Sequence, residues 1–210
     1  AVHTVVPREG DTTIVAMSTG GVYRSDDDGL SWQPTNSGIS AKFFPDPYPE
    51  FGQCVHKIAA DPDGQALYAQ NHHGVYRSDD DGRTWTSIAD GLPSDFGFVV
   101  LAHPAQSGTA WVIPLVADGE RIPPEGRLRV WRTSDGGHTW LPSEGGLPDQ
   151  CWTVVLRDAA DVVVEPDHPD GTLVFGTRDG CVYLSDDGGR SFEQIAAHLP
   201  DVLCVRALVD

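Results

Sequence analysis

The sequence SDDDGLSW at residues 25–32 recurs three times along this chain of 210 residues. The further copies are SDDDGRTW at 78–85, TSDGGHTW at 133–140 and SDDGGRSF at 185–192, so consecutive copies start 53, 55 and 52 residues apart. Each copy has a Ser or Thr first, an Asp third, a Gly fifth, a Ser or Thr seventh and an aromatic residue last. We call these four segments the acidic turns. Their regular spacing predicts a protein built from structural repeats.

Every recurrent residue of an acidic turn has a structural role in a tight hairpin. The Gly supplies a positive φ, and the Asp carboxylate can accept hydrogen bonds from N–H groups of its own turn. The aromatic residue begins the returning strand and can pack between neighbouring sheets. No copy carries the Glu that ends an EF-hand calcium loop, so we interpret the turns as folding motifs. The residues given structural roles are Asp27, Gly29, Trp32, Asp80, Gly82, Trp85, Asp135, Gly137, Trp140, Asp187, Gly189 and Phe192.

Between the acidic turns, short apolar runs alternate with turn residues in a way that predicts four strands per repeat. In the second repeat the runs cover residues 55–60, 66–71, 74–78 and 84–88. A four-stranded sheet that recurs at this period is the blade of a β-propeller. We therefore predict an all-β fold, a β-propeller of four-stranded antiparallel blades, as a single domain over residues 1–210. The predicted blades cover residues 1–36, 52–90, 96–145 and 160–197.

The acidic turn resembles the Asp-box, or BNR repeat, of sialidase-like β-propellers, within the wider group of WD40/YVTN-like repeat proteins. The resemblance spans nearly the whole chain and implies a ring of six or seven blades, of which this chain is the C-terminal portion. One more apolar run, residues 202–209, is expected to be an extra strand that closes a blade. Three explanations stay open: missing N-terminal blades complete the ring, a second chain completes it, or the ring is unusually small.

Composition excludes several classes of partner and leaves others open. The formal net charge of −17 disfavours a nucleic acid or an anionic membrane surface. No run of 18 apolar residues is present, so no membrane-spanning helix is predicted. Cys54, Cys151, Cys181 and Cys204 show no CxxC pattern and are predicted to be free, buried thiols. No cofactor is predicted, no signal peptide is visible, and the cellular location is left open.

In an up-and-down blade, the turns between second and third strands and the links between blades lie opposite the acidic turns. The loops predicted there are unequal in length, which favours a binding function for that face. The residues singled out as ligand-binding candidates are Asn71, His72, His73, Arg121, Trp152, Arg178 and Tyr48.

An enzymatic function is the alternative. Glycosidases need two facing carboxylates, and the weak catalytic candidates are Glu120 and Asp158 with Arg157, with Asp95 and Asp149 as further carboxylates. Arg157 and Asp158 are also expected to form a buried pair. The sialidase resemblance implies an arginine triad and a Tyr activated by a Glu, which no residues here can be assigned to match. The Arg-Ile-Pro sequence at 121–123 is similar to a sialidase element, but it follows the second acidic turn, and we interpret it as coincidental.

A metal-dependent function would use His56, His72, His73 and His103, but their spacing fits no standard zinc pattern, and no metal site is predicted. Photosystem II assembly factors look similar in their Asp-boxes and act by binding. We therefore predict a non-catalytic scaffold that binds a protein, a glycan or a small ligand on the face opposite the acidic turns. The alternative is a sialidase-like exo-acting glycoside hydrolase whose remaining active-site residues lie in missing N-terminal blades.

Overall fold

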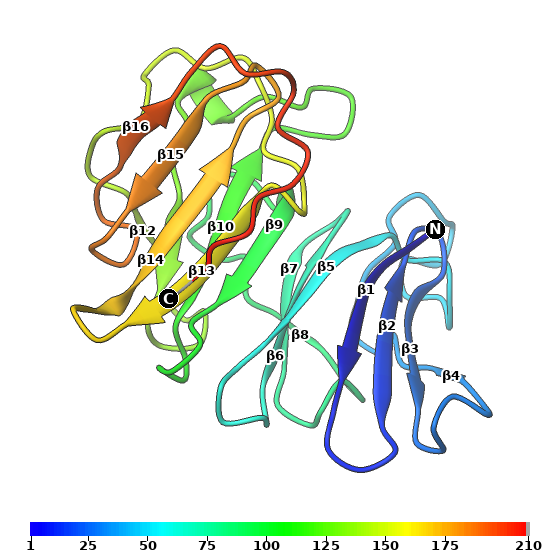
Figure 1. Ribbon diagram of the computed structural model, residues 1–210. Helices are drawn as coiled ribbons and strands as arrows, with labels where there is room; N and C mark the ends of the chain where they lie inside the picture. Colours follow the sequence, from blue (N-terminus) through cyan, green and yellow to red (C-terminus); the bar gives the residue numbers. More distant parts are fainter. Residues whose placement is uncertain (209–210) are drawn as a thin grey trace.

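The computed structural model describes residues 1–208 as four sheets, each of four antiparallel strands in chain order (Figure 1). The first two sheets consist of β1 (Val2–Pro7), β2 (Thr13–Met17), β3 (Gly21–Ser25), β4 (Gln33–Pro34), β5 (Val55–Ala60), β6 (Leu67–Asn71), β7 (Val75–Ser78) and β8 (Thr86–Ser87). The other two consist of β9 (Phe96–Ala102), β10 (Ala110–Leu115), β11 (Trp131–Thr133), β12 (Leu141–Pro142), β13 (Ala160–Glu165), β14 (His168–Gly176), β15 (Val182–Ser185) and β16 (Glu193–Ala196). This arrangement confirms the predicted propeller blades.

One short 3-10 helix, η1 (Pro124–Gly126), interrupts the link between β10 and β11. Across residues 1–208, no helix has the length and apolar character needed to cross a membrane.

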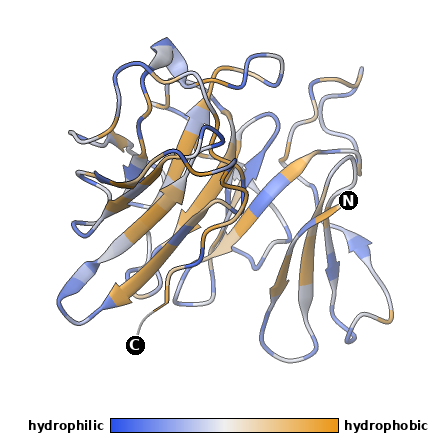
Figure 2. Ribbon diagram, turned by 45° about the horizontal axis from the view of Figure 1, so that its top comes forward, coloured by the Kyte–Doolittle hydropathy of each residue, from blue (hydrophilic) through white to orange (hydrophobic). Residues whose placement is uncertain are grey.

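The hydrophobic core lies between the blades, because adjacent sheets bury their facing surfaces against each other. Ile14 and Val22 of blade 1 pack with Ile58 and Leu67 of blade 2. A second cluster joins blades 2 and 3, and a third joins Trp111 of blade 3 to the sheet of blade 4. The apolar colouring in Figure 2 follows the strands and gives way to hydrophilic colouring in the turns. The first strands lie side by side, since β5 contacts both β1 and β9, and β9 contacts β13.

The four acidic turns share one set of hydrogen bonds. The first hydroxyl donates to the Asp carboxylate at 2.7–2.8 Å and accepts from the Gly N–H at 2.8–2.9 Å. The seventh residue donates to the same carboxylate from its N–H at 2.8–3.0 Å and from its hydroxyl at 2.6–2.7 Å. The bonds from Thr139 hold the pKa of Asp135 down to about 2. All of these partners lie within eight residues of one another, so the turn is specified locally.

Two consecutive residues of each acidic turn have positive φ, as a tight hairpin of this hand requires. In the second turn these are Asp81, at 59°, and Gly82, at 78°. Asp tolerates the left-handed region better than most residues, which explains why only Asp or Gly occupies the first of these two positions.

The aromatic residue of an acidic turn fastens one blade to the blade before it. Trp85 is buried and donates from Nε1 to the carbonyl of Thr35 at 3.0 Å, and Trp140 donates to Ile88 at 2.7 Å. Trp32 was expected to pack in the same way, and that expectation is wrong within this chain. Its side chain is 38% exposed and its Nε1 bonds to Gly29 of its own turn, since within residues 1–208 the sheet of blade 1 packs against the sheet of blade 2 alone.

The expected closing strand at residues 202–209 does not form over residues 202–208, and residue 209 lies outside the described residues. The segment makes isolated bonds instead of a ladder. Val202 donates to Thr177 at 3.2 Å and Val205 to Asp158 at 2.8 Å, whereas Ala207 bonds to the side chain of Asp161. Ala207 donates to the Asp161 carboxylate and not to a backbone carbonyl of β13, so the segment forms no continuous ladder with that strand.

The turns are divided between two faces of the molecule. The β1–β2 turn lies beside the first acidic turn, since Asp28 donates to Asp11 at 2.9 Å, and Gly136 and Gly108 are joined in the same way in blade 3. We call this side, at the bottom of Figure 1, the acidic-turn face. The opposite side, formed by the β2–β3 type turns and the links between blades, is the loop face.

Candidate functional site

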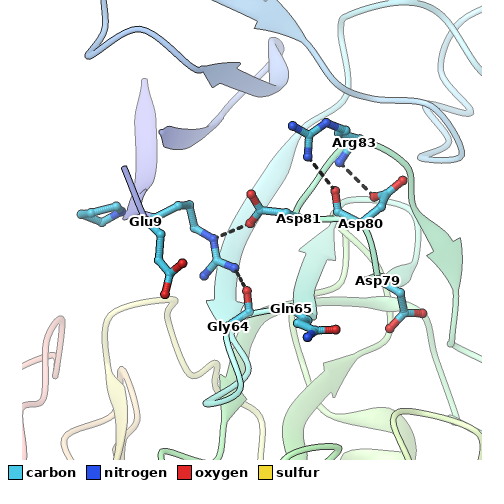
Figure 3. A pocket seen from close by; sticks show the side chains of 9 residues that line it. Glu9, Gly64, Gln65, Asp79, Asp80, Asp81 and Arg83 are labelled. Carbon is cyan, nitrogen blue, oxygen red and sulfur yellow. Dashed lines mark hydrogen bonds and ion pairs between the residues drawn. The ribbon is translucent and has the colours of Figure 1, made fainter. Parts of the chain in front are cut away.

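The largest hollow on the acidic-turn face lies between blades 1 and 2 and has a volume of about 640 Å³ (Figure 3). Its charged walls are paired with one another. Arg8 donates to the carboxylate of Asp81 at 2.5 Å and to the carbonyl of Gly64, and Arg24 bonds to Asp81 at 2.7 Å. Similar hollows of about 450 and 90 Å³ lie between blades 2 and 3 and between blades 3 and 4. Because such a hollow recurs at each blade interface, it is a general feature of the repeated structure and does not mark one binding site.

Histidine and phenylalanine side chains gather on the loop face where the first strands of blades 2 and 3 meet. We call this group the His–Phe cluster. The ring of His56 lies 5.6 Å from that of His72 and 4.8 Å from that of Phe98, and His72 lies 4.8 Å from His73. The guanidinium of Arg121 lies 5.3 Å from the ring centre of Phe98, within the range of a cation–π contact. The cluster also contains Phe43 and Phe96.

A β-bulge places a histidine at the same point in the first strands of blades 1 and 2. The strand pairing slips between Val2 and Thr4 in β1 and between Val55 and Lys57 in β5, so His3 and His56 are the extra residues. The Nδ1 of His3 bonds to the carbonyl of Val55 at 2.8 Å, and the Nδ1 of His56 bonds to Gly97 at 2.6 Å. Each bulged histidine therefore links its blade to the next one.

The bond to a carbonyl decides the tautomer of His56. A carbonyl only accepts, so Nδ1 carries the proton and Nε2 keeps its lone pair. Burial lowers the pKa of His56 to about 4, and burial also lowers the pKa of His72. Both rings are consequently neutral near pH 7.

Within residues 1–208, a group that could hold a metal ion consists of Cys54, His56 and His72, whose ligand atoms lie within 4.8 Å of one another. The metal-dependent hypothesis grouped His103 with His56, His72 and His73, and this is wrong for His103. His103 lies beside the β9–β10 turn on the acidic-turn face, stacked on Trp111 at 5.8 Å. Its Nδ1 accepts from the N–H groups of Ala105 and Gln106, so it serves that turn.

A second feature of the loop face is a hollow of about 380 Å³ between blades 3 and 4, which we call the Trp152 pocket. Trp152 is 67% exposed, and its ring lies against the backbone of Gly126. A Cβ at Gly126 would come within 2.9 Å of the indole, so the Gly allows this contact. Arg178 forms an ion pair with Asp201 at 2.7 Å in the same hollow. The indole is thus held against Gly126, and charged and polar groups line the hollow beside it.

The remaining ligand-binding candidates fall into different environments. Asn71 is fully buried, and its Nδ2 donates to the carbonyls of Ser40 at 2.9 Å and His73 at 3.1 Å. It therefore holds the β6–β7 turn against the 35–54 loop and does not reach the rim. Tyr48 is 62% exposed in that loop, and Arg121 pairs with Asp118.

The catalytic candidates are not brought together. Arg157 and Asp158 were expected to pair, and this is wrong: Asp158 pairs with Arg206 at 3.7 Å, whereas Arg157 lies over the ring of Phe98 at 5.9 Å. Glu120 is exposed in the turn after β10. Two more loop-face carboxylates also face cations, since Asp95 pairs with Lys42 at 3.3 Å and Asp118 with Arg121. The Arg121 bond lowers the pKa of Asp118, which favours the ionised form over a proton-donating acid.

Sequence reasoning missed Cys54 and Gly126 as parts of the loop face. All four cysteines are free thiols, as predicted, but only Cys151 is buried and Cys204 is exposed. Cys54 directly precedes the predicted strand 55–60 and stands two residues before His56, and this proximity was the available signal for Cys54.

Comparisons with known proteins find similarity both in sequence and in structure. No family model matches the chain. A curated xyloglucanase from Paenibacillus sp. is 32% identical over 110 residues, which are 51% of this chain and 10% of that protein. The chain thus spans about a tenth of the length of this relative.

Solved structures of similar shape include GH74 enzymes and a YCF48 protein. An ancestral GH74 enzyme matches 94% of this chain and 24% of its own, with a TM-score of 0.68 and 20% identity. The GH74 xyloglucanase from Xanthomonas campestris matches 95% of this chain and 31% of its own, with a TM-score of 0.64 and 20% identity. YCF48 from Cyanidioschyzon merolae matches 94% of this chain and 56% of its own, with a TM-score of 0.58 and 13% identity. At these identities the likeness shows the β-propeller fold alone.

Proposed function

We propose that this chain is part of a BNR-type β-propeller related to glycoside hydrolases, and that its loop face binds a neutral saccharide. The Trp152 pocket is the proposed binding site. The ligand class is a β-linked glucan such as xyloglucan, because the curated relative is a xyloglucanase. In this proposal the residues of this chain bind the saccharide and do not cleave it.

The observation that carries the proposal is the supported and exposed indole of Trp152. The apolar face of a sugar ring can stack on an aromatic ring, and a side chain already held against Gly126 loses little freedom when it binds. Arg178 and Asp201 offer hydrogen-bond donors and acceptors for sugar hydroxyls beside the ring. This combination of an apolar platform with a few polar groups is typical of small-ligand sites.

The proposal is tested by titrating xyloglucan oligosaccharides into the protein and its Trp152→Ala variant by calorimetry. We expect saturable binding by the wild type and a loss of roughly 30-fold or more in the variant, the effect of removing a central aromatic anchor. Trp32→Ala is the matched control, because Trp32 is also partly exposed but lies in the first acidic turn. Equal affinity of the wild type and Trp152→Ala would reject the Trp152 pocket as the site.

Hydrolysis is the second candidate, and the xyloglucanase relative is the observation that favours it. A glycosidase needs one carboxylic acid that donates a proton and a second carboxylate that acts as base or nucleophile. Within residues 1–208, the loop-face carboxylates Asp95, Asp118 and Asp158 each face a cation. This pairing favours binding over acid catalysis for this chain. Release of reducing sugar from xyloglucan that disappears in Asp158→Asn or Glu120→Gln would support the enzyme instead.

A further inference from the structure

Three side chains with metal-binding atoms converge beside the His–Phe cluster. The Sγ of Cys54 and one ring nitrogen each of His56 and His72 all lie within 4.8 Å of one another. Zinc bonds of about 2.3 Å to sulfur and 2.0–2.1 Å to nitrogen place tetrahedral ligands roughly 3.3–3.7 Å apart. The longest separation between these atoms must therefore shorten by roughly 1 Å before all three can bind one ion. Cys54 and His72 are only half-buried, so their side chains have room for this movement.

The backbone explains why these three residues face one another. The N–H of His72 donates to the carbonyl of Cys54 at 2.9 Å, so the two residues face each other just beyond the Val55–Asn71 pair that ends the β5–β6 ladder. His56 is two residues after Cys54 and occupies the bulge of β5. Side chains of cross-strand partners and of residues i and i+2 lie on the same face of a sheet, and a bulge re-aims the extra side chain.

The second ring nitrogen of His56 keeps its lone pair, because Nδ1 carries the proton that is donated to Gly97. The histidine ligands of metal sites almost always donate their other N–H to a carbonyl, carboxylate or water, which fixes the ring and the tautomer. The bond from Nδ1 of His56 to the carbonyl of Gly97 at 2.6 Å has this form. His3 makes the equivalent inter-blade bond to Val55, but the residue before it is Val2, which offers no ligand atom. The bond from the bulged histidine to the next blade therefore occurs in both blades, whereas of the two only blade 2 has a thiol, that of Cys54, beside it.

The set of donors selects a class of metal. One thiolate and two neutral imidazoles suit a borderline-soft divalent ion, and three protein ligands leave a fourth position open in a tetrahedral site. The hydroxyl of Ser18 lies 3.4 Å from the Sγ of Cys54 and can donate to a thiolate. We propose that Cys54, His56 and His72 bind one Zn²⁺ ion, with the fourth position open toward the loop face. The ion would lie apart from the Trp152 pocket, so the zinc experiment tests this site independently of saccharide binding.

The experiment is a zinc titration of the full chain, prepared without a histidine tag, in competition with a chromogenic chelator. We expect one equivalent of Zn²⁺ to bind. Co²⁺ used alone as a second probe should give a thiolate-to-cobalt absorption band, which identifies sulfur as a ligand. Cys54→Ser and His72→Gln should each weaken Zn²⁺ binding by more than about 100-fold, beyond the usual effect of changing an outer partner. His56 is left unchanged because its Nδ1 joins two blades.

Matched controls use a histidine and a cysteine outside the group. His73→Gln changes the neighbouring imidazole, and Cys204→Ser removes an exposed thiol. Both should bind Zn²⁺ as the wild type does, and the thermal unfolding of all four variants without metal should show that they are folded. The proposal is overturned if the wild type binds less than one equivalent, if Cys54→Ser keeps the wild-type affinity, or if Cys204→Ser removes the cobalt band.

Discussion

Blades 1 and 2 follow the same sequence plan but differ in what surrounds them. Trp85 is 4% exposed and bonds to the blade before it, whereas Trp32 is 38% exposed and bonds to its own turn. His56 is 3% exposed between the first strands of two neighbours, whereas His3 is half-buried with a neighbour on one side only. The comparison separates what a repeat does by itself from what it does through its neighbours. The hydrogen bonds of the acidic turn are local, while the aromatic and histidine positions depend on the adjacent blade.

The largest effect is expected for the aromatic residue of blade 2. Trp85→Ala removes a buried side chain and its bond to Thr35, and we expect it to lower the free energy of unfolding by about 3–5 kcal/mol. Trp32→Ala should cost much less, because its ring is already partly in water. Urea unfolding of both variants measures the difference. Equal losses would contradict the role of Trp85 as an inter-blade contact.

An intermediate effect is expected from the protonation of His56. Its pKa is about 4 in the folded protein, mainly because of burial, against 6.5 when exposed. Between these values the unfolded chain takes up a proton that the folded chain does not, so stability falls as the pH is lowered from 6.5 to 4. The loss reaches up to about 3 kcal/mol and stops below pH 4.

Urea unfolding at pH 7.5, 6, 5 and 4 tests this dependence. In His56→Gln the fall in stability over this pH range should be smaller than in the wild type. His3→Gln should change the dependence less, because His3 is covered on one side only, although burial lowers its pKa in the same direction. A pH dependence that is unchanged in His56→Gln would show that other groups cause it.

The smallest effect is expected for the carboxylates of the acidic turns. Asp80→Ala leaves the N–H of Thr84 and two hydroxyls without their acceptor, and we expect a loss of about 1–3 kcal/mol. Asp27 makes the same bonds, so Asp27→Ala should cost no more than Asp80→Ala. Saccharide affinity should stay nearly unchanged in both. A much larger loss in blade 2 than in blade 1 would mean that the acidic turn also depends on its neighbours.

The sequence was sufficient for the blades and their turns because the determining contacts are short in range. The Asp80 carboxylate bonds only to residues of its own turn, and strands in such a blade pair with their neighbours in the chain. The predicted closing strand failed because the sequence shows the apolar run at 202–208 but not the partner that it would need. An apolar pattern alone forms no ladder without a free strand edge, and Leu203 and Leu208 of this run are in fact exposed.

The candidate sites could be predicted only in part because their contacts are long in range. Asn71 looked like a rim residue, but the 35–54 loop folds over it and buries its side chain. Arg157 and Asp158 were grouped because they are adjacent, but they lie in a turn whose side chains face different partners, Phe98 for Arg157 and Arg206 for Asp158. Cys54 and His72 meet through strand register, which the sequence pattern does not state.

The bulges of the first strands have a consequence for how this architecture can diversify. They bring His3, His56 and Phe98 of three successive blades into neighbouring positions, with ring centres 6.4 and 4.8 Å apart. None of the three takes part in an acidic turn. Each of these three blades therefore contributes one side chain to a common row, and mutation there can alter chemical character while the hairpins that specify the architecture stay the same. Duplication of such a unit yields a row of separately evolvable positions.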